Sequence, residues 1–379
     1  MAILKRLALI GSLALSALSC FAEPGVTDTS ITIGMSGPMS GPNGAYGVEM
    51  RQVIEAYFAQ LNKSGGVNGR KLELVALDDG YETEKTVANT KTLLSDKNAF
   101  ALLAYYGSSP TTEAMNSVFG PAKVPLVGTI SGAGTLRDPA NANTRYMFNV
   151  RASYADETEV IVNHMVSLGL KNVAVFYQND GFGKSGLEGV TSALKKHNLT
   201  PSAVGTVERN SLDVSKAVET IAKVTPQAVI MVTLYKPTAA FVKAMKKAGQ
   251  NPMWLTLSPV GAEMLVKELE QDARGIAISQ VVPYPWNEIV PAVREYQKLA
   301  PKPGQYSYYG MEGYLMARTL VEGLKRAGKD LTREKLVSSL ESLTNADIGG
   351  YKLNYSGSSH LGSRFVELTV VGASGRVLR

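Results

Sequence analysis

Residues 173–197 read VAVFYQNDGFGKSGLEGVTSALKKH, and this stretch decides the fold. Its first five residues are apolar or aromatic, as in a buried strand. A turn-forming run, Gln178 to Gly181, follows, and residues 185–197 then have the apolar spacing of an amphipathic helix. A short apolar run that leads through a turn into a helix is the unit of a parallel sheet covered by helices. We therefore predict an α/β fold.

The same unit recurs near the beginning of the chain. A predicted strand, Ile31–Met35, leads through a glycine-rich loop to Tyr46-Gly47 and a predicted helix, much as strand 173–177 leads to Phe182-Gly183. An aromatic–glycine pair thus enters a helix twice, which suggests two similarly built lobes. Coincidence is the alternative, because such pairs are common in loops.

Strands and helices alternate along most of the chain, which predicts parallel sheets covered on both faces. The predicted strands are 31–35, 71–77, 99–104, 124–127, 147–150, 173–177, 203–207, 228–233 and 253–257, with a late strand at 365–371 added to one lobe. The predicted helices are 48–62, 84–95, 111–119, 156–168, 185–197, 213–223 and 237–248. The chain is longer than one hydrophobic core usually holds, so two lobes are expected.

The first 22 residues predict a cleaved secretory signal peptide. Lys5 and Arg6 precede an apolar stretch, 7–18, and small residues, Cys20 and Ala22, stand at the −3 and −1 positions of a cleavage site. The apolar stretch is shorter than the about 20 residues that span a bilayer. A lipoprotein signal also ends in cysteine, but Ala17 stands where it usually has leucine, so simple cleavage is favoured over lipid anchoring at Cys20. We expect a periplasmic protein.

Composition excludes several classes of function. Cleavage after Ala22 removes the only cysteine, hence any disulfide or thiol chemistry, and loss of Lys5 and Arg6 lowers the formal net charge from +6 to about +4. The basic residues are scattered, so we expect no nucleic-acid binding. We also expect no stable membrane insertion and a monomer.

No motif predicts a catalytic residue, a metal site or a cofactor. Gly183-Lys184-Ser185 resembles the end of a phosphate-binding loop, but Gln178 and Asn179 stand where a glycine should open it. The three histidines, His164, His197 and His360, lack a second histidine at ligand spacing. An exported α/β hydrolase is a rival interpretation, and the absence of a Gly-x-Ser-x-Gly motif argues against it.

Hydroxyl and aromatic residues instead follow several predicted strands, where open α/β sheets bind ligands. In the first half these are Tyr105-Tyr106-Gly107-Ser108-Ser109, with Ser109 as the predicted N-cap of the next helix, and the run 128–134. In the second half they are Tyr177, Tyr235 and Ser258. One such serine is more often only a helix cap, but several on both halves indicate a cleft for a small molecule. Hydroxyls beside helix N-termini suit a carboxylate.

Five stretches carry a resemblance to a known family: 33–38, 62–71, 77–79, 174–186 and 279–283. With them the mature chain resembles the periplasmic substrate-binding proteins of ABC importers, in the leucine/isoleucine/valine-binding group. The resemblance implies two Rossmann-like lobes joined by three crossings, the type I periplasmic binding fold. It implies closure on a small-molecule ligand without chemical conversion, and delivery of that ligand to an ABC transporter permease.

The resemblance also implies the lobes and their hinge. The first lobe should comprise 23–148 and 283–347, and the second 149–282 and 348–379. The three crossings should lie near 149–151, 280–282 and 349–351.

By position, the resemblance implies that the ligand carboxylate is held by Ser108, Ser109, Thr129, Ser131 and Gly132, and that Tyr235 closes over it. Tyr46, Tyr106, Tyr177 and Ser258 complete the predicted site.

Two departures from the family pattern bear on the ligand. Ala133 stands where amino-acid binders commonly have threonine, and Ser258 where they have an acidic residue for the ligand ammonium. A buried ammonium without a carboxylate partner is costly. A carboxylate without the α-amino group, such as an aromatic or other organic acid, therefore fits at least as well as an amino acid. If an amino acid binds, another acid must reach its ammonium: Glu263, Glu312 or Asp180. A ligand sensor of the same fold, docking a signalling partner, is the alternative to transport.

Overall fold

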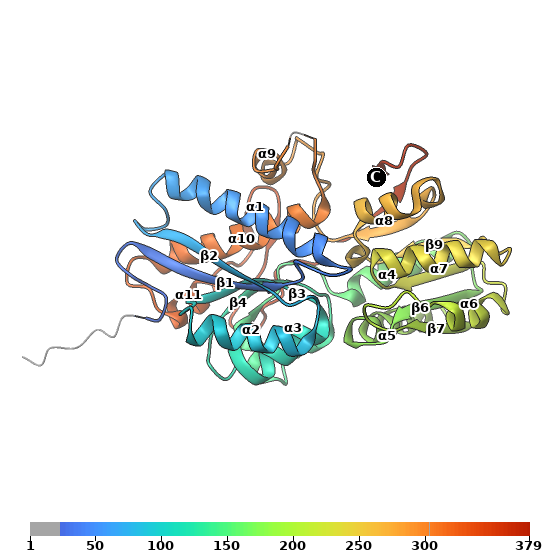
Figure 1. The fold of residues 1–379 in the computed structure, drawn as a ribbon, viewed down its shortest axis with the longest axis horizontal. Coiled ribbons are helices and arrows are strands. Elements are labelled where there is room, and N and C mark those ends of the chain that lie inside the picture. Colours follow the sequence, from blue (N-terminus) through green and yellow to red (C-terminus); the bar gives the residue numbers. More distant parts are fainter. Residues whose placement is uncertain (1–22, 303) are drawn as a thin grey trace, which may run out of the picture.

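The computed structural model describes residues 23–302 and 304–379, so the predicted signal peptide and Cys20 lie outside the described residues. Two α/β lobes lie side by side (Figure 1). One contains a five-stranded sheet with the order β2-β1-β3-β4-β5, and the other a seven-stranded sheet with the order β14-β13-β10-β9-β8-β6-β7. The predicted fold class is confirmed.

The first sheet is parallel throughout, as expected for strands connected by helices. Its strands are β1 (Ser30–Gly37), β2 (Lys71–Asp78), β3 (Ala101–Tyr106), β4 (Leu126–Ile130) and β5 (Met147–Phe148). Helices α1 and α10 lie on one face and α2 and α3 on the other (Figure 1). The helices of this lobe are α1 (Gly44–Lys63), α2 (Thr83–Ser95), α3 (Ser108–Ala114), α9 (Pro291–Gln297), α10 (Tyr308–Ala327) and α11 (Arg333–Glu341).

The second sheet is parallel from β7 to β10, and β13 and β14 extend it antiparallel. Its strands are β6 (Val173–Gln178), β7 (Ala203–Val207), β8 (Ala228–Val232), β9 (Met253–Thr256), β10 (Ala277–Gln280), β13 (Glu367–Val371) and β14 (Val377–Leu378). Its helices are α4 (Tyr154–Ser167), α5 (Gly181–Lys196), α6 (Ser215–Ala222), α7 (Tyr235–Lys247) and α8 (Ala262–Leu269).

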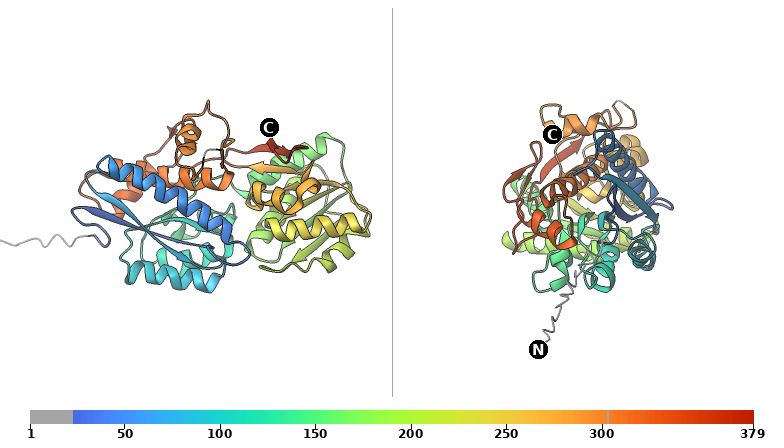
Figure 2. Two further views of the ribbon diagram at one scale, coloured as in Figure 1. Left: turned by 45° about the horizontal axis from the view of Figure 1, so that its top comes forward. Right: turned by 90° about the vertical axis from the view of Figure 1, so that its left-hand side faces the viewer.

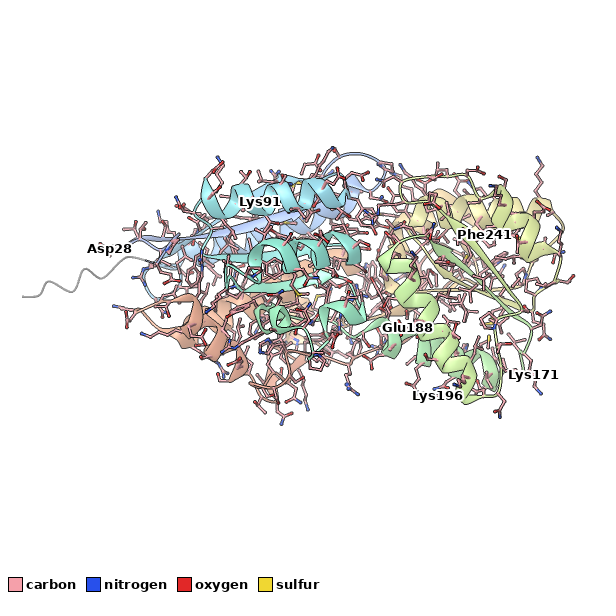
Figure 3. The ribbon with its side chains drawn as sticks, turned by 90° about the horizontal axis from the view of Figure 1, so that it is seen from below. Asp28, Lys91, Lys171, Glu188, Lys196 and Phe241 are labelled. Carbon is pink, nitrogen blue, oxygen red and sulfur yellow. The ribbon has the colours of Figure 1, made fainter. Side chains whose placement is uncertain are left out.

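The helices are amphipathic, as their sequences predict. Lys91 on α2 and Glu188 and Lys196 on α5 are exposed on the outer surface (Figure 3). Phe241 of α7 faces inward, where its ring stacks on that of Phe176 in β6 with centroids 4.0 Å apart. Burial of such apolar faces against the sheets holds each lobe together.

The N-terminal start of α3 differs from the prediction. Gly107, not Ser109, is the N-cap. This position requires glycine, because φ is +89° and a Cβ would lie 2.4 Å from the Tyr81 ring. The helix predicted over 111–119 is also divided, with α3 passing into a π-turn at Met115–Phe119. Ser109 therefore lies inside the helix and its hydroxyl is free to contact the other lobe.

The chain passes between the lobes after β5, after β10 and before β13 (Figures 1 and 2). The Tyr351 hydroxyl donates to the carbonyl oxygens of Val150, at 2.9 Å, and Val281, at 3.2 Å, which ties the first two crossings together. The short hairpin β11 (Ala346–Asp347) and β12 (Lys352–Leu353) precedes the third. The Gly362 amide donates to the carbonyl oxygen of Asn149, directly after β5 of the first lobe, at 2.7 Å. The chain is therefore still beside the first lobe at Gly362, which favours a third crossing after this residue. The predicted lobe boundaries stay a prediction.

None of the helices in the described part of the chain combines the length and the apolar character that a bilayer span requires.

Candidate functional site between the lobes

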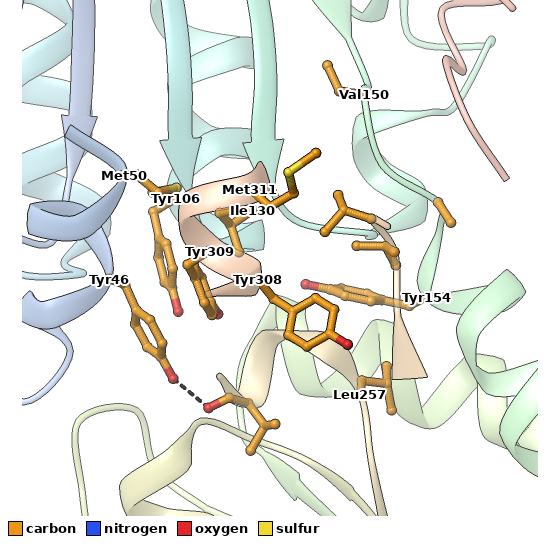
Figure 4. Close-up of a cluster of buried hydrophobic side chains, with 14 of the residues drawn as sticks. Tyr46, Met50, Tyr106, Ile130, Val150, Tyr154, Leu257, Tyr308, Tyr309 and Met311 are labelled. Atoms are coloured by element: carbon orange, nitrogen blue, oxygen red, sulfur yellow. Dashed lines mark hydrogen bonds between the residues drawn. The ribbon is translucent and has the colours of Figure 1, made fainter. Parts of the chain in front are cut away.

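Tyrosine rings fill the space where the two lobes meet (Figure 4). The ring of Tyr46, in the first turn of α1, stacks on Tyr309 with centroids 4.3 Å apart and on Tyr106 at 5.4 Å. Tyr235, from the other lobe, meets the edge of the Tyr46 ring at 5.3 Å. Three of these four residues, all but Tyr309, were predicted from the sequence, and the structure brings them together.

Two tyrosine hydroxyls hold the lobes in contact. Tyr46 donates to the Val260 carbonyl oxygen at 2.7 Å, and Tyr235 donates in the opposite direction to the Pro42 carbonyl oxygen at 2.6 Å. Gly261, beside Val260, has φ of +74°, and a Cβ there would lie 2.7 Å from the Tyr46 ring. Only glycine therefore lets the second lobe approach Tyr46 this closely.

Two more hydrogen bonds join the lobes, from residues at or just after the ends of β3 and β6. The Ser109 hydroxyl accepts a hydrogen bond at 3.0 Å from the Gly181 amide at the start of α5. Gln178 donates to the Tyr81 hydroxyl at 3.0 Å. These contacts and the tyrosine hydroxyls make the described conformation a closed one.

The predicted hydroxyl cluster is present in the first lobe. The hydroxyls of Ser108 and Ser131 are hydrogen-bonded to each other at 2.8 Å, and the Ser131 hydroxyl also accepts from the Ala133 amide at 3.1 Å. Both serines are buried. The Thr129 hydroxyl is instead 3.0 Å from that of Thr111 on α3, so its bond holds the helix to the sheet.

Gly132 contributes backbone only. Its carbonyl oxygen accepts from the Tyr154 amide at 2.8 Å, and a Cβ on Gly132 would lie 2.5 Å from that nitrogen. The site thus requires glycine at this position so that α4 can start close to the serine pair.

An arginine lies at the centre of the contact between the lobes. Arg151, in the first crossing, is 1% exposed, and its guanidinium is 2.7 Å from a Glu157 oxygen and 3.3 Å from a Glu312 oxygen. The same guanidinium donates to the Ser258 hydroxyl. Glu157 also accepts from the Ser258 amide at 2.9 Å and the Ser279 hydroxyl at 2.6 Å. We call these five residues the Arg151 network.

Burial and charge pairing together determine which groups of the network are ionised. It raises the pKa of Glu312 to about 7, although the positive charge of Arg151 acts in the opposite direction. Burial alone would lower the pKa of Arg151, but Glu312 and Glu157 raise it above the ordinary value. The guanidinium therefore stays charged, while Glu312 gains or loses its proton near neutral pH.

The structure does not bring every aromatic residue named from the sequence into the site. Tyr177 is half-buried and takes part in none of the described hydrogen bonds or ring contacts between the lobes, because Gln178, on the opposite face of β6, points there instead. Tyr105 faces the other side of β3 and bonds to the Thr90 hydroxyl at 3.0 Å.

Sequence reasoning missed the roles of Arg151, Glu157, Tyr154 and Tyr309. The one available signal was Arg151 itself, a charged residue directly after a short apolar strand. Glu312 was named only as an acid that an amino-acid ligand would need.

We expect the substitutions Ser108→Ala and Ser131→Ala each to weaken a carboxylate ligand by about 1.5–3 kcal/mol, the contribution of a hydrogen bond to a charged group. Isothermal titration calorimetry measures this loss. Tyr105→Phe is the matched control, since it removes a hydroxyl from a similar buried pair on the far side of β3. Loss of affinity in the control as large as in the serine variants would contradict the assignment.

The fold agrees with comparisons to known proteins. A model of the family described as "Periplasmic binding protein" matches residues 30–375. A possible leucine/isoleucine/valine-binding protein from Rhodopirellula baltica SH 1 has 30% identity and a TM-score of 0.86 over 94% of this chain and 98% of its own. A substrate-binding periplasmic protein from Ralstonia solanacearum has 31% identity and a TM-score of 0.85, with 92% and 99% covered. An amino acid binding protein of Pseudomonas aeruginosa is 24% identical over 66% of this chain and 67% of its own length.

Proposed function

The chain belongs to the periplasmic binding protein family, and from this premise we propose that it is an extracytoplasmic receptor for a small carboxylate-bearing solute. It binds the solute between its lobes and delivers it to an ABC transporter permease, without chemical conversion. The proposal includes export to the periplasm by the predicted signal peptide.

One observation carries the proposal: the buried hydroxyl pair of Ser108 and Ser131 lies beside Ser109, whose hydroxyl contacts Gly181 of the other lobe. A ligand that contacts both lobes favours the closed state by its differential affinity for that state. Neutral hydroxyl donors suit a carboxylate, and Tyr46 and Tyr235 supply the contacts from one lobe to the other.

The Arg151 network favours an acid without an α-ammonium group. The Ser258 hydroxyl accepts from Arg151. A cation of the protein therefore lies beside Ser258, the position at which the family resemblance implies an acidic residue in amino-acid binders. All the described acceptor bonds of Glu157 are made to Arg151, Ser258 and Ser279. A ligand ammonium bound to Glu312 would lie beside the Arg151 guanidinium, which like-charge repulsion disfavours.

A thermal-shift screen with matched ligand pairs tests the ligand class. Each pair shares one carbon skeleton with and without the amino group, for example leucine with 4-methylpentanoate and phenylalanine with 3-phenylpropanoate. We expect the acid of a matching pair, at about 100 times its dissociation constant, to add about 2.7 kcal/mol to the free energy of unfolding.

Two outcomes would contradict parts of this proposal. If the amino acid of each pair binds more tightly, the inference from Ser258 and Arg151 is wrong, and Glu312, Asp180 or Glu263 is the ammonium partner. If no carboxylate of any skeleton shifts the melting temperature, the carboxylate itself is wrong. Once a ligand has been identified, growth of a deletion strain on that ligand distinguishes transport from sensing.

A further inference from the structure

A cavity of about 230 Å³ lies beside the second crossing. Its lining includes Glu263 from the first turn of α8, Tyr284 and Trp286 from the segment after β10, and Val377 of β14. We call it the Glu263 cavity. The rings of Tyr284 and Trp286 are 5.0 Å apart and tilted by 48°, so aromatic surface and a carboxylate line the same small space.

Three buried oxygen atoms near this cavity have no hydrogen-bond partner among the described residues: Glu263 Oε1, Tyr308 OH and Glu367 Oε1. The Tyr308 ring contacts Tyr284 at 6.4 Å and Trp286 at 6.1 Å. Burial is the main cause that raises the pKa of Tyr308. The negative charges of Glu367 and Glu263 raise this pKa further, so the three groups are neighbours. Buried acceptors are normally hydrogen-bonded. The carboxylate oxygens of Glu263 and Glu367 can only accept, so the missing partner of each is a donor.

The charges indicate that this donor is a cation. Glu367 is paired with Arg379 at 2.9 Å, whereas no described ion pair involves Glu263. Arg376 also lines the cavity, but its side chain is exposed and no ion pair joins it to Glu263. Burial raises the pKa of Glu263 to about 8, as expected for a carboxylate without a counter-ion.

We propose that the Glu263 cavity binds a small organic ammonium ion, whose N–H groups donate to Glu263 and whose charge faces the rings of Tyr284 and Trp286. Aromatic faces attract cations, and a desolvated carboxylate beside them adds a strong acceptor. A metal ion is a weaker fit, because the described residues contain no group of three or more acidic, histidine or cysteine ligands.

Tryptophan fluorescence of the mature protein tests this proposal locally. The chain has two tryptophans, so Trp254→Phe leaves Trp286 as the only one. n-Propylammonium chloride is the probe, 1-propanol the neutral control, and tetramethylammonium chloride a cation without N–H donors. We expect a saturable change with n-propylammonium, a weaker one with tetramethylammonium and none with 1-propanol.

Variants assign the binding to Glu263. We expect Glu263→Gln to lower the affinity for n-propylammonium about 10- to 100-fold, and Arg376→Gln to raise it severalfold by removing a competing cation. Glu268→Gln, on the same helix but outside the lining, is the matched control. If Glu263→Gln does not fold, Tyr284→Leu measured by calorimetry replaces it, with a similar loss expected. Absent n-propylammonium binding, equal binding of 1-propanol, or an unchanged affinity in the Glu263 or Tyr284 variant would overturn the proposal.

Discussion

Replacing Arg151 with methionine is expected to destabilise the protein by about 3–5 kcal/mol, the range for removing one partner of a buried ion pair. The substitution keeps much of the side-chain volume but leaves Glu157 and Glu312 buried without their cation. Urea unfolding at pH 8, where Glu312 is mostly ionised, measures the loss. At pH 5.5 the loss should be smaller, because Glu312 is then protonated.

A surface ion pair provides the control for this experiment. Arg51 and Glu55 lie 2.9 Å apart on α1 with side chains about half exposed, and Arg51→Met should change stability by less than about 1 kcal/mol. Adding Glu157→Gln and Glu312→Gln to Arg151→Met should restore part of the loss, since no unpaired buried charge then remains. If Arg151→Met alone costs as little as Arg51→Met, the network does not hold the lobes together.

Glu312→Gln is expected to change how stability depends on pH. Burial raises the pKa of Glu312 from its ordinary 4.5 to about 7, so the folded protein keeps a proton that the unfolded chain releases. The stability from this proton is fully present below about pH 4.5 and is lost as the pH rises to about 7. A shift of this size corresponds to roughly 3 kcal/mol.

The free energy of unfolding, measured by urea between pH 4.5 and 8, tests this dependence. Relative to the unsubstituted protein, the glutamine variant should become more stable as the pH rises, and the difference should level off above pH 7. Glu159→Gln, on the surface of α4, is the control and should leave the pH profile unchanged. A glutamine variant whose profile parallels that of the unsubstituted protein would show that Glu312 does not titrate in this range.

Most of the elements could be predicted because their signals are local. Strand 173–177 and helix 185–197 are recognisable from apolar runs and helical spacing, and the structure has them at 173–178 and 181–196. The helices between residues 258 and 348 were not predicted. α10 shows one physical reason: all residues from 308 to 317 are buried, so the first half of this helix lacks the polar face that marks an amphipathic helix.

The candidate site also contains residues whose positions could be predicted from local signals and residues whose positions could not. Ser108 and Ser131 follow strands that are neighbours in one sheet, and the ends of neighbouring parallel strands meet at one edge, so their proximity could be predicted. Tyr177 could not be placed correctly, because a one-residue shift in a strand turns the side chain to the other face and Gln178 took that position.

The sequence by itself determined two α/β lobes and a hydroxyl-bearing edge in the first of them, because burial periodicity and turn residues act over short distances. The tertiary structure alone decided which charges meet between the lobes. Arg151 and Glu312 are 161 residues apart in the chain, and Ser258 comes from the other lobe. No local pattern relates these residues, since their contact depends on how two separately folded lobes close on each other.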